Sequence, residues 1–389
     1  MRIVILCGQL YPTKSNNTTL LSNLLPHLKA GNELRLVATC RPGTNPSELP
    51  EEYEGIPIEW LRPNRESSLH AKLTAVYAKL VDRNGYSDAV LVRQYRGLLS
   101  ELYGRWRFTA LLSISEPFPA AAAGATFAGK LHTAVYFMDP PKDVQGAADT
   151  PYRSHCFRTI LRKYRSVFST PFFRDALMQN GFDAFCAKTH SVGFPIMTEE
   201  TLRKRRAASS ETISLLFTGW MCSDIRSPQY FLDIVSRLDE RFTVTFMGRE
   251  CEKLQQRFPT QSRAKLITLP QQPYETALQA MADADVLINI GNSVPVHMPS
   301  KTLEYINTGK PIVNFYKMDN CPTLYYTNRY PICLNLSERE AEPDAAAARF
   351  IDFCVTNKGK VVDRGLIERE YADCTPQYIA NVILDALES

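Results

Sequence analysis

Three residues with complementary chemistry, Ser300, Lys301 and Glu304, lie within five positions of the stretch "MPSKTLEYINTGKPIVNF", residues 298–315. The stretch predicts a helix that begins after Pro299 and stops at Gly309. Free amides at a helix N-terminus bind anions, and Lys301 adds a positive charge, so this turn suits a phosphate or diphosphate. Glu304 lies one turn deeper and suits a pair of ribose hydroxyls. The alternative is an ordinary capped helix, in which Ser300 caps backbone amides and the two charged residues form surface contacts.

Short apolar runs alternate with helical patterns along the chain, and these elements must position the residues above. The runs are continuously apolar, which is typical of parallel strands covered on both faces. The pattern predicts doubly wound α/β domains, in which ligands bind at the carboxyl ends of the strands, here in a cleft between two domains. Strands are expected at residues 2–7, 33–39, 89–94, 110–115, 133–138, 166–170, 213–219, 242–248, 264–269, 285–291 and 311–316. Helices are expected at residues 17–30, 71–85, 170–181, 227–240, 273–284 and in the stretch described first.

The length of 389 residues exceeds the usual size of one hydrophobic core, so two domains are expected. We predict a first domain at residues 1–197, a polar and basic linker at 198–211, a second domain at 212–374 and a final helix at 375–389. With 44% hydrophobic and 22% charged residues, the composition is that of an ordinary globular protein. No apolar stretch reaches the length that spans a bilayer.

The cysteines and glycines argue against several classes of site. The ten cysteines form no C-x-x-C pair and no metal-like spacing with histidine, so we expect free thiols in a reducing compartment and a cytoplasmic protein. Single glycines, Gly8 and Gly219, follow the first strands of the two domains, which argues against a nicotinamide or flavin enzyme. Asp283 and Asp285 precede a strand and are interpreted as a helix end, so no metal site is expected.

Positive charge is concentrated in the first half of the chain. Residues 1–195 hold 23 Lys and Arg against 16 Asp and Glu, and the remainder holds 22 against 25. A solvated helix face is the simplest interpretation of the densest cluster, and peripheral contact with an anionic membrane or with a phosphorylated acceptor is the alternative. No nucleic-acid recognition motif accompanies the cluster, so nucleic acid is not an expected partner. The cluster consists of Arg153, Arg158, Arg162, Lys163 and Arg165.

The stretch "DVLINIGNSVPVHMPSKTLEYINTGKPIVNF" resembles the nucleotide-sugar site of the retaining family 4-like glycosyltransferases of the GT-B fold. Bacterial members of that family carry a donor helix that reads "PSK-x-x-E-Y-x-x-x-G-K-P". Further similarity lies in "LLFTGWMCSDIRSPQYFLDIVSRL", "ITLPQQPYETALQAMADADVLINIG", "SVFSTPFFRDALMQNGF" and "HSVGFPI". The resemblance covers roughly residues 166–320 and implies GT-B architecture, with two tandem Rossmann-like domains facing a central cleft.

The resemblance implies roles for the donor-side residues. Ser300 and Lys301 would face the donor diphosphate, and Glu304 would hold the ribose. Gly219 would let the backbone approach the sugar or diphosphate, and Arg226 would be the cation on the phosphates after this strand. His297, Met298, Pro299 and Thr302 complete the expected donor site.

The chain departs from the family pattern at two points. Many relatives carry a first glutamate eight residues before the second, where this chain has Val296. The lysine that is usual in the loop after Gly219 has no evident counterpart between Trp220 and Ser227. The leaving group would therefore rely on Arg226 and Lys301.

Acceptor-side candidates follow the strands of the first domain. Glu116 and Asp139 each come directly after an apolar strand and are candidate catalytic residues near the cleft, with a turn or cap role as the alternative. In the loop after the first strand, where relatives often have glycines, the candidates are Asn16, Asn17 and Thr18.

The expected function is transfer of a hexosyl group from a UDP- or GDP-sugar to a glycan, a lipid-linked acceptor or another small acceptor, with retention, in surface polysaccharide or glycoconjugate synthesis. The resemblance implies that no metal or other cofactor is required. The alternatives are a nucleotide-sugar epimerase of the same fold and a catalytically silent binding subunit. In this fold the last helix commonly returns to the first domain, and we expect it to bury Tyr378, Ile379, Ile383 and Leu384.

Overall fold

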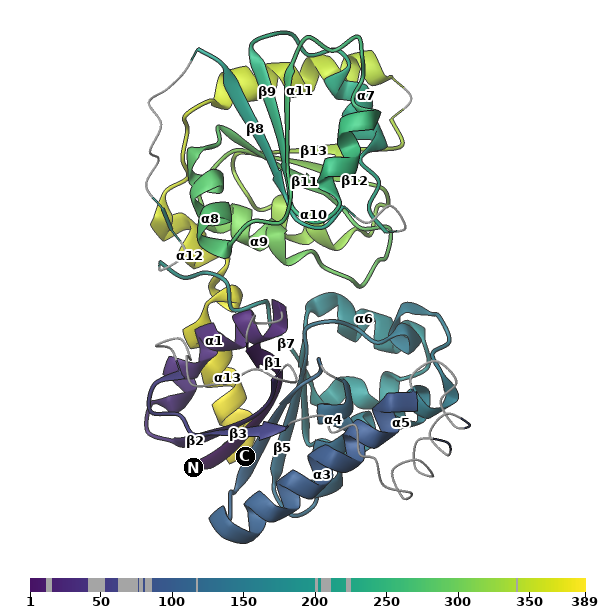
Figure 1. Ribbon diagram of the computed structural model, residues 1–389, viewed down its shortest axis with the longest axis vertical. Coiled ribbons are helices and arrows are strands. Elements are labelled where there is room, and N and C mark those ends of the chain that lie inside the picture. The colour runs from purple at the N-terminus through teal and green to yellow at the C-terminus, as the bar shows by residue number, and fades with distance from the viewer. Residues whose placement is uncertain are drawn as a thin grey trace. The chain divides into compact units, whose positions relative to one another are not determined.

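The computed structural model describes residues 1–11, 16–40, 53–61, 76, 80, 86–116, 118–199, 202–203, 211–221, 225–340 and 342–389. The chain divides into a first unit, residues 1–195 with 373–389, and a second unit, residues 196–372 (Figure 1). Each unit is built on one parallel sheet with helices on both faces, so the predicted fold class is confirmed. Most of the helix expected at 71–85 and most of the expected linker lie outside the described residues; residues 76 and 80 are described and are helical.

The first unit has a seven-stranded parallel sheet in the order β3-β2-β1-β4-β5-β6-β7. Its strands are β1 (Arg2–Tyr11), β2 (Glu33–Cys40), β3 (Ile58–Leu61), β4 (Ala110–Ile114), β5 (His132–Phe137), β6 (Ser166–Ser169) and β7 (Thr189–Ser191). Its α-helices are α1 (Asn16–Lys29), α3 (Tyr86–Trp106), α4 (Phe118–Gly124), α5 (Pro151–Lys163), α6 (Pro171–Gln179) and α13 (Pro376–Glu388). Short 3-10 helices are η2 (Ala125–Phe127), η3 (Lys142–Gln145), η4 (Asp183–Lys188) and η6 (Ala372–Cys374), the last spanning the boundary between the units.

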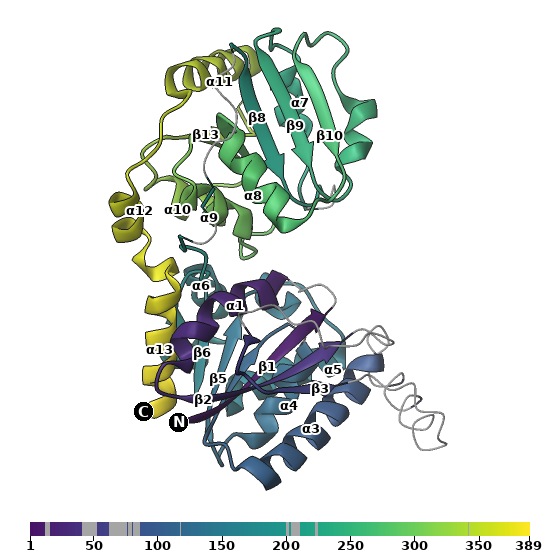
Figure 2. The same cartoon turned by 60° about the vertical axis from the view of Figure 1, so that its left-hand side comes forward.

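Helices cover both faces of this sheet, which explains its continuously apolar strands. Helices α1 and α13 pack against each other on one face, and α3, α4 and α5 cover the other (Figures 1 and 2). Every residue of β4 and of β6 is buried. The strands lack alternation of polar and apolar residues because both of their faces are buried.

The strand expected at residues 89–94 is wrong, because this segment belongs to helix α3. Its short apolar run, "AVLV", satisfies a strand pattern locally. The buried residues that follow, Tyr95, Leu99 and Leu102, recur at helical spacing and form the inner face of α3. The helical spacing of apolar residues over the 21 residues of α3 therefore indicates the structure correctly, whereas the six-residue run alone predicts a strand.

The second unit has a six-stranded parallel sheet in the order β10-β9-β8-β11-β12-β13. Its strands are β8 (Ile213–Thr218), β9 (Phe242–Met247), β10 (Lys265–Leu269), β11 (Val286–Ile290), β12 (Ile312–Tyr316) and β13 (Cys333–Ser337). Its helices are α7 (Gln229–Val235), η5 (Cys251–Arg257), α8 (Tyr274–Asp283), α9 (Ser300–Asn307), α10 (Pro322–Thr327), α11 (Pro343–Asn357) and α12 (Arg364–Glu370).

The order of the second sheet reverses between β8 and β11, which are neighbours although two strands separate them in the chain. In open α/β sheets, such a switch point is where ligands bind, at the carboxyl ends of the strands. Helices α7 and α11 pack on one face of the sheet with a core of Phe231, Phe315 and Phe350. Helix α9 follows β11 and packs against it, so its first turn lies at this edge (Figure 1).

Helix α13 belongs to the first unit, where it packs on α1, β5 and β6 (Figure 2). Its buried face differs in part from the expected one. Ile379 and Ile383 are buried as expected, but Tyr378 is 45% exposed and Leu384 is only partly buried. The buried stripe is completed by Ala380, Ala386 and Leu387, because the helix presents positions three and four apart to the sheet.

Two further features concern the environment of the chain. Among the described residues, no helix is long and apolar enough to cross a membrane. Each of the described cysteines is a free thiol, and most of them are buried.

Candidate functional site

Helix α9 begins at Ser300 without a side-chain cap. Its N-cap residue is Pro299, which has no side-chain acceptor, and the Thr302 amide donates to the Pro299 carbonyl oxygen at 3.1 Å. The capped-helix interpretation required Ser300 to act as the cap, and this part of it is wrong. The positive end of the helix dipole therefore stands at the carboxyl edge of the sheet, and within the described part of the chain no side chain caps it.

Lys301 and Glu304 form an ion pair on the outer side of this turn. Lys301 Nζ lies 2.5 Å from Glu304 Oε2, and the two side chains are 24% and 13% exposed. The ammonium also lies 5.6 Å from the centroid of the Tyr274 ring, at the start of α8. This contact agrees with the charge pairing of the capped-helix interpretation, while the partial burial gives both charges more strength than a fully solvated pair has.

Other expected donor-site side chains face the protein interior. Met298 and Pro299 are buried, and the Thr302 hydroxyl donates to Asn289 Oδ1 at 3.1 Å. Asn289 in turn donates to Asn314 Oδ1 at 2.6 Å, and Asn314 donates to Asn335 Oδ1 at 2.8 Å. This row of asparagines, buried at Asn289 and Asn314 and half-buried at Asn335, joins β11, β12 and β13 in register and holds the first turn of α9 to the sheet.

The loops after β8 and β9 approach each other at the same edge through one glycine each. Gly219 and Gly248, which follow β8 and β9, have φ angles of +144° and +141° that side chains rarely adopt. A Cβ on Gly248 would stand 2.0 Å from the carbonyl oxygen of Gly219. Only glycine permits this approach, so the backbone at Gly219 is held in a defined turn.

Arg226 bridges the loops that follow β8 and β11. Its Nε and Nη2 donate to Asn292 Oδ1 at 3.2 and 2.9 Å, and its Nη1 donates to the carbonyl oxygen of Trp220 at 3.2 Å. Asn292 also donates to the carbonyl oxygen of His297 at 3.0 Å, and its Nδ2 lies 3.1 Å from His297 Nδ1. The guanidinium is thereby fixed beside Gly219, and His297 helps to fix it.

The structure therefore gathers Gly219, Arg226, His297 and the α9 turn within the second unit, at the ends of two adjacent strands. The two loops that Arg226 links and the N-terminus of α9 form a cationic edge that can bind an anion. Val296, at the position where relatives carry a glutamate, is buried and supplies no charge. Among the described residues, no group of His, Cys, Asp and Glu side chains is arranged to hold a metal ion.

In the first unit, two of the acceptor-side candidates meet. Asn17 Nδ2 donates to Asp139 Oδ2 at 3.0 Å, and Thr18 donates to the carbonyl oxygen of Gln9 at 2.9 Å. The expectation that Asn16, Asn17 and Thr18 lie in a loop is wrong, because all three belong to the first turn of α1, which Thr18 ties to β1. The side chain of Asn16 lies outside the described residues.

Glu116 stands near Asp139 at the end of β4. The residue is exposed, yet surrounding protein crowds its carboxyl enough for desolvation to raise its pKa. The negative charge of Asp139 raises this pKa further, and Arg153 opposes both effects. A carboxyl with a raised pKa at a strand end can accept a proton from a hydroxyl more readily than an ordinary glutamate.

The basic cluster is divided by the fold. Arg153 forms ion pairs with Asp88 at 3.0 Å and with Asp149 at 3.6 Å. Arg158, Arg162, Lys163 and Arg165 are exposed on and just after α5. Arg165 donates to the carbonyl oxygen of Ser389, so the exposed cations of α5 itself are Arg158, Arg162 and Lys163.

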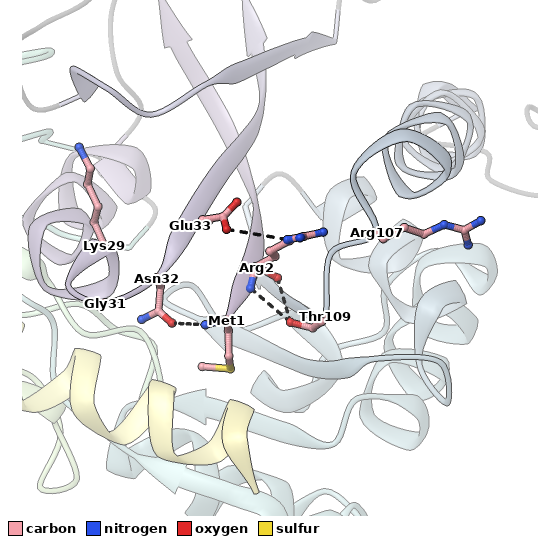
Figure 3. Close-up of a pocket in the computed structure, with 8 residues that line it drawn as sticks. All are labelled: Met1, Arg2, Lys29, Gly31, Asn32, Glu33, Arg107 and Thr109. Atoms are coloured by element: carbon pink, nitrogen blue, oxygen red, sulfur yellow. Dashed lines mark hydrogen bonds and ion pairs between the residues drawn. The ribbon is translucent and has the colours of Figure 1, made fainter.

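A hollow lies at the edge of the first sheet where its strands begin, and its side chains are not arranged as a binding site (Figure 3). Arg2 lies beside Glu33, at 3.9 Å, and donates to the carbonyl oxygen of Trp106. Figure 3 shows that Lys29 and Arg107 point away from the hollow, so its cationic groups do not converge on a ligand position.

Sequence reasoning missed several residues that shape the cationic edge. Asn292 lies two residues after the end of β11, and a polar residue just past a strand end is a signal that could have found it. Asn289 stands inside an apolar strand, where a buried amide indicates a structural network. Tyr305, whose phenol contacts Thr218, had no local signal because the two residues are 87 positions apart.

No protein-family model matches the sequence, and no curated protein is significantly similar to it. The structure is similar to sucrose-phosphate synthase from Thermosynechococcus elongatus, with a TM-score of 0.69 and 12% identity over 99% of this chain and 97% of that chain. It is also similar to Anabaena HepE in complex with UDP-glucose, with a TM-score of 0.61 and 12% identity over 99% and 100%. For the lipopolysaccharide outer core galactosyltransferase WaaB the TM-score is 0.59, with 12% identity over 99% of each chain. Two parallel-sheet units and these neighbours together show that the chain has the GT-B glycosyltransferase fold.

Proposed function

We propose that this protein is a glycosyltransferase that moves a hexosyl group from a UDP- or GDP-sugar to an acceptor hydroxyl. One observation carries the proposal: the uncapped first turn of α9, with Lys301 and Glu304, stands at the switch point beside Gly219 and Arg226. This edge combines anion-binding amides, two cations and one carboxylate that can accept hydrogen bonds from ribose hydroxyls. The donor-helix resemblance to family 4-like enzymes supports the same assignment.

The proposed chemistry follows from the charges that develop in transfer. Breaking the glycosidic bond places negative charge on the departing diphosphate and positive charge on the anomeric carbon. Arg226, Lys301 and the α9 amides are fixed before the reaction and stabilise the leaving group as its charge grows. We propose that these groups suffice without a metal ion, and that the configuration at the anomeric carbon is retained.

The first unit would supply the acceptor side. Glu116 and Asp139 lie at neighbouring strand ends and would orient or deprotonate an acceptor hydroxyl. The exposed cations of the α5 surface would bring a lipid-linked acceptor to the protein at an anionic membrane. We propose a glycan or lipid-linked acceptor and a cytoplasmic role in surface polysaccharide or glycoconjugate synthesis.

Neighbouring structures support the donor class. Anabaena HepE is described in complexes with UDP and with UDP-glucose, and WaaB is described as a galactosyltransferase. The names of these neighbours and the charges at the cationic edge both support a nucleotide-sugar donor.

The test is calorimetric titration with UDP and GDP, followed by donor turnover with and without acceptor lipids or glycans. Binding of one nucleoside diphosphate and acceptor-dependent release of it are expected, with activity unchanged by chelator. Release of sugar or epimer without acceptor would favour the epimerase. Binding without any turnover would favour a silent subunit, and chelator-sensitive activity would refute metal independence.

A further inference from the structure

Strands β8 and β11 separate before either of them ends. Their register pairs Val286 with Leu215 and Leu287 with Leu216, and pairing stops there. On its other side, β8 pairs with β9 as far as Thr218, and β11 pairs with β12 as far as Ile290. The last two residues of β8 therefore have strand neighbours on one side only, and the sheet opens at its switch point.

The phenol of Tyr305 takes the vacant position. The Thr218 amide donates to the Tyr305 hydroxyl at 2.7 Å, and that hydroxyl donates to the Thr218 carbonyl oxygen at 3.2 Å. The Thr218 side-chain oxygen lies 3.1 Å from the same hydroxyl. Tyr305 is fully buried, and burial raises its pKa to about 12, so the phenol keeps its proton. Without it, a buried amide and a buried carbonyl would have no partner.

This contact joins the parts of the proposed donor site. Thr218 precedes the Gly219 turn, in which the Trp220 carbonyl oxygen accepts from Arg226 Nη1 at 3.2 Å. Tyr305 follows Glu304 on α9. The first turn of α9 has its own attachment to the sheet through Thr302 and Asn289. Loss of the Tyr305 hydroxyl would therefore disturb the Gly219 loop more than the helix.

We propose that Tyr305 is a positioning residue that replaces β11 as the backbone partner of Thr218 and holds the open switch point in the shape that receives the donor diphosphate. The inference rests on the proposed function and assigns the phenol a part in it. Its side chain is fully buried, so Tyr305 would act through the Gly219 turn and Arg226.

The experiment compares Tyr305→Phe with Tyr164→Phe. Tyr164 is the matched control, because it is also fully buried and its hydroxyl contacts Ser113 Oγ at 2.6 Å and the carbonyl oxygen of Ala121 at 2.9 Å, in the first unit. Titrations use UDP or GDP, whichever the wild type binds, and the matching nucleoside without phosphates. Far-UV circular dichroism verifies that each variant is folded at the temperature used.

Tyr305→Phe is expected to weaken diphosphate binding about tenfold and to leave nucleoside affinity unchanged. A tenfold loss is the size of one lost hydrogen-bonding contribution. Tyr164→Phe is expected to lose stability without changing either affinity. Equal affinities of wild type and Tyr305→Phe, or equal weakening of both ligands, would overturn the inference. Absence of nucleotide binding in the wild type would refute the proposed function as well.

A second measurement needs neither a variant nor a ligand. Amide hydrogen exchange of the wild type, resolved by residue, should show Thr218 protected to the level of Leu216, although Thr218 lacks a β11 partner. Exchange of the Thr218 amide at the rate of an exposed loop would show that Tyr305 does not replace the strand.

Discussion

Lys301 Nζ and Glu304 Oε2 lie 2.5 Å apart, so their charges neutralise each other on one turn of α9. We propose Lys301 as the cation for the diphosphate and Glu304 as the carboxylate for the ribose. A diphosphate bound at this turn would draw on the same ammonium. In the proposed donor site, Glu304 would therefore have two effects: it would accept hydrogen bonds from the ribose, and its ion pair would orient Lys301.

Replacing Glu304 with Gln should weaken nucleoside diphosphate binding by about 1.5 to 3 kcal/mol, as expected for charge-assisted hydrogen bonds. Lys301→Ala should lower turnover at least as much as affinity, since the leaving group gains charge in the transition state. Calorimetric titration and initial rates measure both. Glu368→Gln, which breaks the exposed pair with Arg364 on α12, is the control and should change neither. Wild-type affinity in both site variants would sink the donor-site assignment.

Replacing Asp285 with Ala should lower the free energy of unfolding by about 3 kcal/mol. Asp285 is buried and accepts from the Ser214 amide at 2.9 Å and from the Ser214 hydroxyl at 3.0 Å, which ties β11 to β8. Urea unfolding measures the change. Asp283→Ala, two positions away on the partly exposed end of α8, should cost less than 1 kcal/mol, on the order of surface substitutions. Similar losses in the two variants would contradict this assignment.

The stability of the second unit should fall as pH rises from about 5 to about 7.5. Burial raises the pKa of Glu338 from 4.5 to about 7, and Lys317, 4.0 Å away, only partly opposes this. Because the folded carboxyl binds its proton more tightly than the unfolded one, stability is fully present below the unfolded pKa and is lost as pH rises through the folded one. The loss from this group is on the order of 3 kcal/mol.

Glu338→Gln removes that titration and is the test of its origin. Urea unfolding of wild type and variant at pH 5 and pH 7.5 should give similar values at the lower pH and a more stable variant at the higher. A pH dependence that is the same in both proteins would place the titrating group elsewhere.

Replacing Ile383 with Ala should destabilise the first unit by about 2 to 5 kcal/mol, because its fully buried side chain on α13 faces the sheet. Tyr378→Ala, on the exposed side of the same helix, should have an effect below about 1 kcal/mol. In a Trp220→Phe background the remaining tryptophans, Trp60 and Trp106, report unfolding of the first unit by fluorescence. A larger effect at Tyr378 than at Ile383 would reverse the assignment of the buried face.

The sequence by itself determined the architecture and the place of the cationic helix turn. Continuous apolar runs specify strands that are buried on both faces, and this property is local to each run. The spacing of Lys301 and Glu304 likewise places both on one turn of α9, because helical geometry brings positions three apart together.

Tertiary structure alone decided which distant groups meet. The residues 89–94 form a helix because the later part of α3 buries its face on the sheet, and the buried stripe of α13 is set by packing on α1 and β5. Asn17 meets Asp139 across 122 positions, and Tyr305 meets Thr218 across 87. Such pairs leave no periodic mark in the chain, since each depends on how strands are ordered in the sheet and on which backbone groups that order leaves unpaired.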